Sequence, residues 1–322
     1  MPSEVSNLRR ISKSAWDPTD AAHVLILAGG DGVRLRPLTR ALAGDDRPKQ
    51  FCAVVGEESL LAQTLRRAAL LVPRERIHVV LTRRHEPYYR EIVAGLSPSS
   101  LVIQPENRGT ATAVLYGLLR VAARKAEGPI VVLPSDHWVS DDAIFMAHAA
   151  AALGLVDVQG DVVVLLGIVP SRPEPEFGWI EPAASSIGGW LDLHRVHRFV
   201  EKPAPEAARA LQAGRSLWNS SVVVSQIPAL GRLFGAALPA VVNAFLRVCG
   251  TFGNSSEAAA VERLYGELPV TDLSRDVLAA LPEALAVLRV AGVGWDDVGL
   301  PDRALAGLSA AAVAERPAAE RF

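Results

Sequence analysis

The feature that most constrains this chain is a glycine-rich loop that directly follows a short apolar strand. The strand pattern covers residues 23–28. Three glycines fall within the next four positions, Gly29, Gly30 and Gly32. In α/β sheets ligands bind where strands end, and glycines let the backbone turn sharply and present bare N–H groups to an anion. Since Arg34 and Lys49 can add positive charge, the loop predicts a phosphate-binding site.

The two commoner glycine motifs do not fit this loop. A Walker loop ends in Gly-Lys followed by Ser or Thr, and a dinucleotide-binding loop needs a third glycine where this chain has Leu35. A glycine turn with a solvated basic face is the simpler alternative. The segments Pro37-Leu38-Thr39 and Pro48-Lys49-Gln50-Phe51 favour the phosphate site over that alternative.

Composition limits the classes of function. The 322 residues are half hydrophobic, enough for one large domain or two smaller ones. A formal charge of −2 gives no global attraction to nucleic acid or to an anionic membrane. Two cysteines, Cys52 and Cys249, form neither a disulfide framework nor a metal-binding spacing, so we expect a reduced, cytoplasmic protein.

Three segments are expected along the chain. Residues 1–22 are polar and are predicted to be a disordered extension, residues 23–300 form one continuous domain, and residues 301–322 form a helical segment. The longest apolar stretch, residues 143–156, is shorter than a membrane span and is predicted to be a buried helix.

The order of elements predicts an α/β fold of Rossmann-like type, with a mostly parallel central sheet flanked by helices. Strands are expected at 23–28, 77–82, 101–103, 130–133 and 162–169, and helices at 60–71, 86–94, 111–126 and 143–156. Ser59 and Thr110 are the expected helix caps, and Gly128 the expected stop. The second half predicts a smaller mixed-strand region against the same sheet, with strands at 178–181, 190–200 and 217–224, helices over 228–280 and a last strand at 286–290.

Six motifs occur in one fixed order. They are the glycine loop, Pro105-Glu106-Asn107-Arg108-Gly109-Thr110-Ala111, Leu133-Pro134-Ser135-Asp136-His137, Phe199-Val200-Glu201-Lys202-Pro203, Trp218-Asn219-Ser220 and Trp295-Asp296-Asp297-Val298-Gly299. This order resembles the sugar-nucleotide pyrophosphorylases, most closely the mannose-1-phosphate guanylyltransferase branch. The resemblance implies a nucleotidyltransferase domain that uses GTP and mannose 1-phosphate to make GDP-mannose and pyrophosphate.

The resemblance also implies the catalytic residues. Arg34 would hold the β- and γ-phosphates, Lys49 would reach toward the α-phosphate, and Lys202 would hold the phosphate of the sugar. All reactants are anions, so neutralising charge is the central task of such a site. Asp136 and Asp297 stand where the family places its magnesium ligands, and Mg²⁺ prefers such oxygen donors. The alternatives are a turn cap for Asp136, and Asp296 as the ligand in place of its neighbour.

Nucleotide binding is assigned by the resemblance to the glycine loop and to the segment around 105–111. The residues are Ala28, Gly29, Gly30, Gly32, Arg34, Glu106, Asn107, Gly109, Thr110 and Ala111. The helix that starts near Thr110 could also meet phosphate through its free N–H groups. Thr110 as a simple helix cap is compatible with that role.

The sugar-binding residues implied are Gly178, Glu201 and Asn219, with Lys202 on the sugar phosphate. Backbone amide, carboxylate and side-chain amide suit sugar hydroxyls. The alternative is a strand bend at Gly178, a Glu201–Arg198 ion pair and a turn cap at Asn219.

Other functions remain open. This chain has Ser221 where the family usually has glycine, and its segment 271–276 differs from the usual Ser-Ile-Asp-Tyr type. A uridylyl- or thymidylyltransferase acting on glucose 1-phosphate is one alternative, and a non-catalytic nucleotide-sugar sensor is another. The partners expected are small molecules, compatible with a homodimer, and neither nucleic acid nor membrane.

Overall fold

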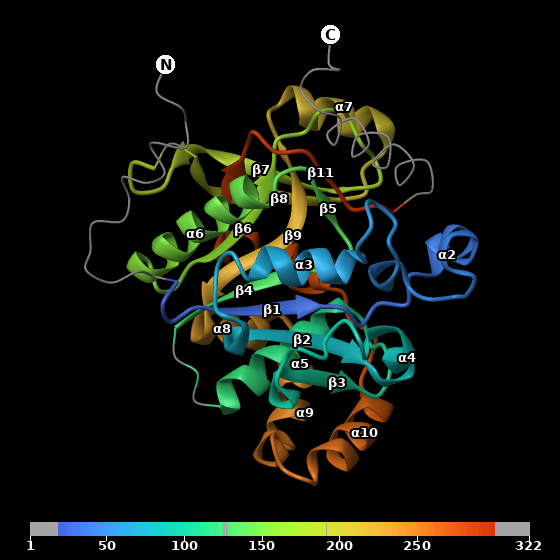
Figure 1. Cartoon of the computed structure of the whole chain (residues 1–322). Coiled ribbons are helices and arrows are strands. Elements are labelled where there is room, and N and C mark those ends of the chain that lie inside the picture. The colour runs from blue at the N-terminus through green and yellow to red at the C-terminus, as the bar shows by residue number, and fades with distance from the viewer. Residues whose placement is uncertain (1–18, 125, 127, 191, 300–322) are drawn as a thin grey trace.

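A nine-stranded sheet in the order β3-β2-β1-β4-β9-β6-β10-β8-β7 runs through the part of the chain that the computed structural model describes, residues 19–124, 126, 128–190 and 192–299 (Figure 1). Four strands from the first half lie parallel to one another: β1 (His23–Leu27), β2 (Ile77–Thr82), β3 (Leu101–Gln104) and β4 (Pro129–Pro134). The apolar runs of β1, β2 and β4 are buried on both faces of the sheet, as is usual for parallel strands. The predicted α/β, Rossmann-like fold is confirmed.

The second half of the chain completes the same sheet. Its strands are β6 (Val163–Ile168), β7 (Gly178–Ser186), β8 (Leu193–Glu201), β9 (Leu217–Gln226) and β10 (Leu285–Val290). Strand β9 lies antiparallel between β4 and β6, and β8 lies antiparallel between β10 and β7. A short antiparallel pair, β5 (Trp138–Val139) and β11 (Trp295–Asp296), carries the last motif to the end of β4.

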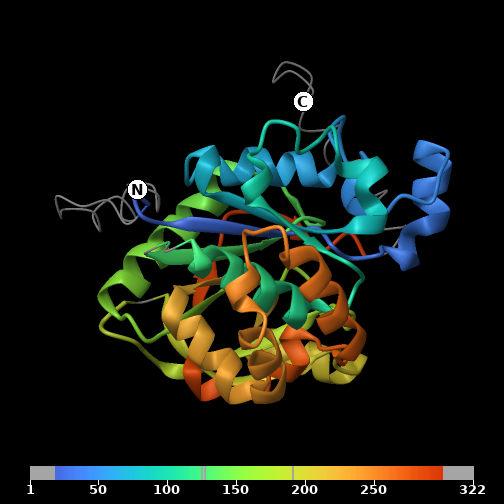
Figure 2. The same cartoon turned by 90° about the horizontal axis from the view of Figure 1, so that it is seen from below.

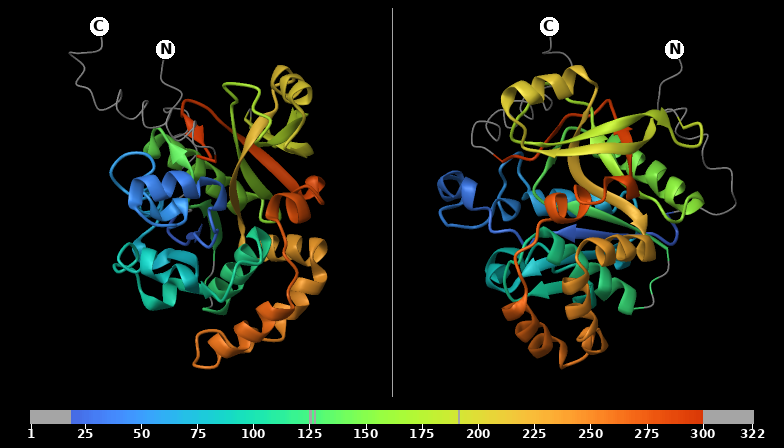
Figure 3. Two further views of the ribbon diagram at one scale, coloured as in Figure 1. Left: turned by 90° about the vertical axis from the view of Figure 1, so that its right-hand side faces the viewer. Right: turned by 180° about the vertical axis from the view of Figure 1, so that it is seen from behind.

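Helices cover both faces of the sheet (Figure 2). One face packs against α3 (Leu60–Ala68), α4 (Glu86–Tyr89) and α6 (Asp142–Val158). The other packs against α5 (Thr110–Ala123), α8 (Ile227–Ala237), α9 (Pro239–Leu246) and α10 (Glu257–Glu267). Figure 3 shows α7 (Pro205–Ala213) at the opposite end of the molecule from α9 and α10, while α2 (Arg36–Ala43) lies beside the glycine loop.

Details of the predicted helices are wrong. Helix α5 ends at Ala123 with Arg124 as its C-cap, so Gly128 is not its stop. Thr110 is the first residue of α5 and not its cap, because Gly109 takes the cap position with φ 88°. The helix expected over 86–94 ends at Tyr89 and continues as turns. The Ser59 cap is confirmed, since its side chain accepts a hydrogen bond from Ala62 N at 3.2 Å.

Some expectations fall outside the described residues. These are the disordered extension over residues 1–18 and the helical segment from 301 onward. The domain boundaries at 23 and 300 stay predictions.

Apolar helices in the described residues belong to the core. The stretch predicted as a buried helix is α6, in which Ala149, Ala152 and Leu153 are fully buried. No single described helix is long and apolar enough to cross a membrane. The helical segments 227–237 and 239–251 are long and apolar enough for a membrane span only when they are taken together, and the chain bends by 120° between them.

Candidate active site

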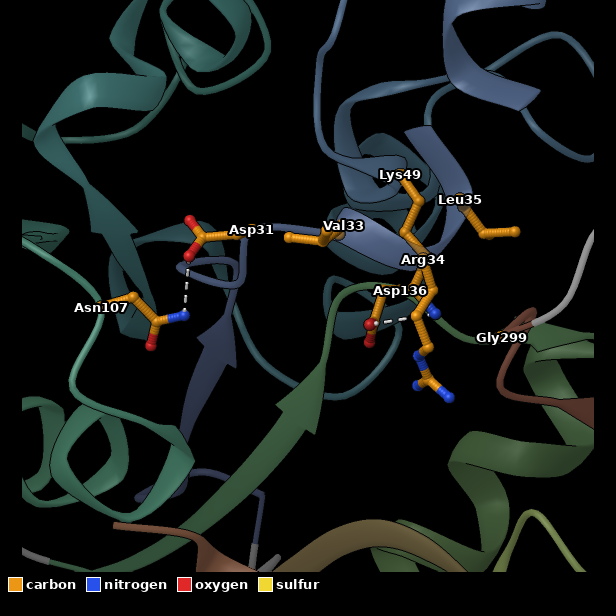
Figure 4. Close-up of a pocket in the computed structure, with 9 residues that line it drawn as sticks. Asp31, Val33, Arg34, Leu35, Lys49, Asn107, Asp136 and Gly299 are labelled. Carbon is orange, nitrogen blue, oxygen red and sulfur yellow. Dashed lines mark hydrogen bonds and ion pairs between the residues drawn. The ribbon is translucent and has the colours of Figure 1, made fainter. Parts of the chain in front are cut away.

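A cavity of about 360 Å³ opens where β1 and β4 end (Figure 4). Its lining comes from the glycine loop, the Lys49 segment, the loop after β3, the end of β4 and the last motif: Asp31, Gly32, Val33, Arg34, Leu35, Lys49, Asn107, Asp136 and Gly299. The three residues predicted to be catalytic, Arg34, Lys49 and Asp136, therefore share one cavity. Parallel strands present their carboxyl ends on one edge, which is why loops distant in sequence meet here.

The glycine loop has its shape because larger residues would not fit. Gly32 has φ 57°, and a Cβ atom there would lie 2.9 Å from Lys49 N. A Cβ on Gly29 would lie 2.4 Å from Gln104 Nε2. Thr82 Oγ1 donates to the Gly29 carbonyl at 2.8 Å. Gly32 therefore requires glycine for its backbone angle and for space, while a side chain at Gly29 would displace the end of the Gln104 side chain.

Gln50 holds the glycine loop from the other side. Its Nε2 donates to the carbonyls of Ala28, at 3.2 Å, and Gly30, at 2.7 Å. Gln50 is 2% exposed, so these bonds are shielded from water. We did not assign it a role from sequence, although it stands in the Pro-Lys-Gln-Phe segment that pointed to the phosphate site.

Lys49 links three parts of the site. It is 8% exposed, and its Nζ lies 3.2 Å from Asp136 Oδ2. The same ammonium donates to the carbonyl of Asp297 at 2.5 Å and to that of Val298 at 3.3 Å. Lys49 therefore joins the glycine-loop side of the cavity to the end of β4 and to the last motif.

Asp136 is an ionised carboxylate that faces the cavity. Burial raises the pKa of Asp136, but the charges of Lys49 and His137 and a hydrogen bond from Lys49 outweigh it and hold the pKa below its ordinary value. The side chain is 35% exposed. His137 Nε2 lies 3.6 Å from Asp136 Oδ1, and burial lowers the pKa of His137.

The structure distinguishes the two neighbouring carboxylates of the last motif. Asp296 Oδ2 accepts from Arg172 at 3.0 Å, and its Oδ1 accepts from Val298 N at 2.8 Å. Asp297 accepts from Gly299 N at 2.8 Å through its side chain. The described residues hold no group of three or more His, Cys, Asp or Glu side chains placed to bind a metal. The magnesium site of Asp136 and Asp297 thus stays a prediction that also needs phosphate oxygens.

Of the predicted nucleotide-binding segment 105–111, Asn107 lines the cavity. Its Nδ2 donates to Asp31 Oδ2 at 3.2 Å, and its Oδ1 accepts from Gly109 N at 2.9 Å. Four predicted residues in this segment do not appear among the described residues lining the cavity: Glu106, Gly109, Thr110 and Ala111.

The N-terminus of α5 is covered by the segment that precedes β10. Ala111 N donates to the Thr271 carbonyl at 3.2 Å, and Thr110 Oγ1 donates to Asp272 Oδ2 at 3.3 Å. A Cβ on Gly109 would lie 2.0 Å from Thr271 O. A carboxylate and a carbonyl already occupy the helix start, so this end of α5 is less open to phosphate than a free helix terminus.

Asp31 is a cavity residue to which sequence reasoning gave no role. It pairs with Arg84, and its Oδ1 lies 3.3 Å from His85 Nε2. Burial raises the pKa of Asp31, but hydrogen bonds from Arg84 and Asn107 lower it by more, so the pKa lies below its ordinary value. The signal in the sequence that could have identified Asp31 as a cavity residue is its position inside the glycine loop.

Three predicted sugar-binding residues come together on the β7–β8–β9 part of the sheet. Gly178 pairs with Glu201 in the ladder, and a Cβ at 178 would lie 2.7 Å from Glu201 Oε2 and 3.4 Å from Asn219 Cβ. Arg198 binds Glu181 at 2.8 Å, so the alternative Glu201–Arg198 pair is wrong. Asn219 Oδ1 accepts from Ser221 N at 3.0 Å, so the turn-cap role is also present.

Electrostatics connects this cluster with the cavity. Loss of hydration raises the pKa of Glu201, and the charges of Asp272 and Asp297 raise it further. Lys202 follows Glu201 directly, in a left-handed conformation with φ 45°. The Lys202 backbone N donates to Phe177 O at 3.3 Å.

The fold and the site define a class of protein, the nucleotidyltransferases. Residues 23–311 match the family described as Nucleotidyl transferase, and this chain belongs to that family.

Two curated relatives show how far the likeness extends. The chain is 30% identical over 279 residues to the xanthan biosynthesis protein XanB of Xanthomonas campestris pv. campestris (strain B100), covering 85% of this chain and 57% of that one. It is 31% identical over 285 residues to a mannose-1-phosphate guanylyltransferase of Sinorhizobium fredii (strain NBRC 101917 / NGR234), covering 85% and 52%. The chain thus spans about half the length of these curated relatives.

Solved structures support the same fold. A Thermus thermophilus protein named mannose-1-phosphate geranyltransferase has 33% identity and a TM-score of 0.74, with 87% of this chain and 76% of that chain covered. A Helicobacter pylori protein named mannose-6-phosphate isomerase has 20% identity and a TM-score of 0.63, with 86% and 99% covered. The second likeness concerns the fold alone.

Proposed function

We propose that this protein transfers GMP from GTP to mannose 1-phosphate, giving GDP-mannose and pyrophosphate. The observation that carries the proposal is the convergence of Arg34, Lys49 and Asp136 in one cavity. The guanylyl and mannosyl parts are supported by the match of the 105–111 segment to that branch and by the name of the Sinorhizobium relative.

The reaction is an in-line displacement at phosphorus. An oxygen of the sugar phosphate forms a bond to the α-phosphorus of GTP, and the bond to the bridging oxygen breaks with its electron pair leaving on pyrophosphate. A phosphate monoester carries nearly two negative charges near neutral pH, so its oxygen needs no general base. The work left to the protein is to position and neutralise anions.

Arg34 and Lys49 are the cations placed for the triphosphate. Lys49 is already held by Asp136 and by two carbonyls, so its ammonium is positioned before substrate arrives. Arg34 is exposed and lines the same cavity, and Figure 4 shows its side chain extending past Asp136. Positioned cations cost no reorganisation when charge shifts to the leaving pyrophosphate.

Asp136 and Asp297 would hold a magnesium ion. Asp136 fits this role because its carboxylate is ionised and partly exposed to the cavity. Bound there with the phosphate oxygens, the ion would neutralise charge on the nucleotide.

Glu201 and Asn219 would accept and donate hydrogen bonds to sugar hydroxyls beside Gly178. Lys202 would neutralise the sugar phosphate. An added side chain at 178 would meet the Glu201 carboxylate, so glycine at this position lets Glu201 and Asn219 lie close together.

The test is release of pyrophosphate by purified protein with Mg²⁺ across all pairings of four nucleoside triphosphates with mannose and glucose 1-phosphates. We expect turnover with GTP and mannose 1-phosphate, and turnover lowered by about a hundredfold or more in the Asp136→Asn control. Turnover with UTP or dTTP and glucose 1-phosphate would establish the alternative transferase. Nucleotide-sugar binding without turnover in any pairing would establish the sensor.

A further inference from the structure

Arg172 ties together two loops that the proposed mechanism treats separately. It lies in the connection between β6 and β7, on the sugar side of the molecule. Its guanidinium donates to Asp296 Oδ2 at 3.0 Å and to Glu174 Oε2 at 3.1 Å. Asp296 belongs to the loop of residues 295–299, here called the Asp297 loop. One planar guanidinium fork thus spans the sugar-side connection and the Asp297 loop.

Aromatic rings support the same guanidinium. Arg172 Cζ lies 5.3 Å from the centre of the Trp218 ring and 5.7 Å from that of Phe177. Phe177 packs edge-on against Trp218 at 5.0 Å and against Trp295 at 5.2 Å between ring centres. Since Trp295 immediately precedes Asp296, the aromatic cluster and the ion pair act on the same short stretch of chain.

The Asp297 loop has a conformation that needs support. Val298 has φ 47°, a left-handed conformation that is rare and costly for a β-branched residue. Asp296 Oδ1 accepts from Val298 N at 2.8 Å, so one carboxylate holds this turn and Arg172 at the same time.

The position of this turn matters for the cavity. The carbonyls of Asp297 and Val298 accept the bonds from Lys49, and Gly299 lines the cavity. A shift of the turn would move the Asp297 carboxylate and the anchor of Lys49 together.

From these contacts we propose that Arg172 is a positioning residue for the Asp297 loop. Through Asp296 it holds the turn that places Asp297 and the carbonyls bound to Lys49, and so it sets the affinity for a divalent metal with the nucleotide. This inference rests on the proposed function, because it assumes that a nucleotide–metal complex binds in the cavity. Arg172 itself touches neither.

The test compares metal binding in Arg172→Met, Arg172→Lys and Asp296→Asn with wild type. Electron paramagnetic resonance measures Mn²⁺ affinity in the presence of GTP without sugar phosphate, and calorimetry measures GTP affinity without metal. We expect Mn²⁺ affinity to fall by about 10–100-fold, the usual loss when a residue supporting a metal ligand is removed. Lysine should not rescue, because a compact ammonium lacks the planar fork with which Arg172 binds both acids and stacks on aromatic rings.

A matched control and a double variant complete the design. Arg198→Met removes an arginine that pairs with Glu181 at 2.8 Å on the same region of the sheet, away from the Asp297 loop, and should bind Mn²⁺ like wild type. Arg172→Met combined with Asp296→Asn should lose no more than the more affected single variant, because both act through one contact. Tryptophan fluorescence should change in the Arg172 variants, since Trp218 lies under the guanidinium.

The outcomes separate the inference from the proposed function. Wild-type protein that fails to bind GTP with Mn²⁺ contradicts the proposed function. Wild-type binding that is retained within twofold by folded Arg172→Lys and Asp296→Asn overturns the inference alone. Because Arg172→Lys and Asp296→Asn are milder substitutions, they test the inference even if Arg172→Met does not fold.

Discussion

The ammonium group of Lys49 lies 3.2 Å from the Asp136 carboxylate, although 86 residues separate them in the chain. Lys49 comes from the segment that braces the glycine loop, and Asp136 follows β4. In this pair the charge of Lys49 helps to hold the pKa of Asp136 below its ordinary value. Removing either charge leaves the other without its partner, so each substitution alters the field of the whole site.

Asp136→Asn tests the carboxylate. The amide keeps the shape of the side chain but loses the charge that would hold magnesium, so turnover should fall by about a hundredfold or more. The measurement is pyrophosphate release at limiting and saturating Mg²⁺, with Asp297→Asn in parallel. Near wild-type turnover of Asp136→Asn at limiting Mg²⁺ would show that this carboxylate is no metal ligand.

Arg34→Ala tests whether the loop arginine stabilises the transition state. Negative charge grows on pyrophosphate as it leaves, so turnover should drop by roughly 10²–10³-fold. The side chain is exposed, so the free energy of unfolding should change by less than about 0.5 kcal/mol. Steady-state kinetics and urea denaturation measure the two effects, and an unchanged rate would reduce Arg34 to a solvated surface cation.

Gly30→Ala and Gly109→Ala form a matched pair. A Cβ at Gly30 meets nothing within 4 Å, so we expect an unchanged melting temperature and weaker GTP binding. A Cβ at Gly109 would lie 2.0 Å from Thr271 O, at φ 88°, so that variant should be strongly destabilised. Thermal denaturation and calorimetry with GTP separate these effects. Wild-type GTP affinity in Gly30→Ala would argue that the phosphates do not approach this glycine.

Lys202→Ala tests the cation assigned to the sugar phosphate. Its loss should mainly raise KM for mannose 1-phosphate and leave the GTP affinity measured by calorimetry nearly intact. An equal loss of affinity for both substrates would contradict the placement of Lys202 on the sugar side. Arg209→Ala, on the exposed face of α7, is a suitable control.

The pair His23 and His78 predicts a loss of stability in acid. Burial, followed by neighbouring positive charge, lowers the pKa of His78 to about 3 and that of His23 to about 4, from an ordinary value of 6.5. Because the unfolded chain binds these protons more readily, the free energy of unfolding should fall as the pH drops from about 6.5 toward the folded values. The slope is roughly 1.4 kcal/mol per pH unit for each imidazole.

Urea denaturation between pH 7 and pH 4.5 measures this slope. His78→Gln, which can keep a hydrogen bond to His23, should reduce the slope by about half. The control is His197→Gln, whose side chain is 67% exposed. A slope unaffected by His78→Gln would mean that other groups cause the acid sensitivity.

Local sequence was enough for most of the elements and for the core of the site. Strand β2 has the predicted bounds because a mostly apolar run, broken only by His78 and ended by Thr82, between polar turns is a local signal. The convergence of Arg34 with Lys49 was predictable because both follow strand β1 and its glycine loop. The start of α5 was not predictable from the local sequence, because Thr110 is a good helix cap by residue type. Gly109 takes the cap position instead, and only the carbonyl of Thr271, far along the chain, explains why glycine is needed there.

By itself the sequence determined the α/β class, the glycine loop and the order of the motifs, because strand burial and backbone freedom are encoded by neighbouring residues. The tertiary structure alone decided which motifs meet. The additional pairing of β9 with β7 brings Asn219 beside Gly178, and the β5–β11 pair brings the Asp297 carbonyl to Lys49. Such contacts join residues far apart in the chain, and their geometry depends on the packing of the whole sheet rather than on any local pattern.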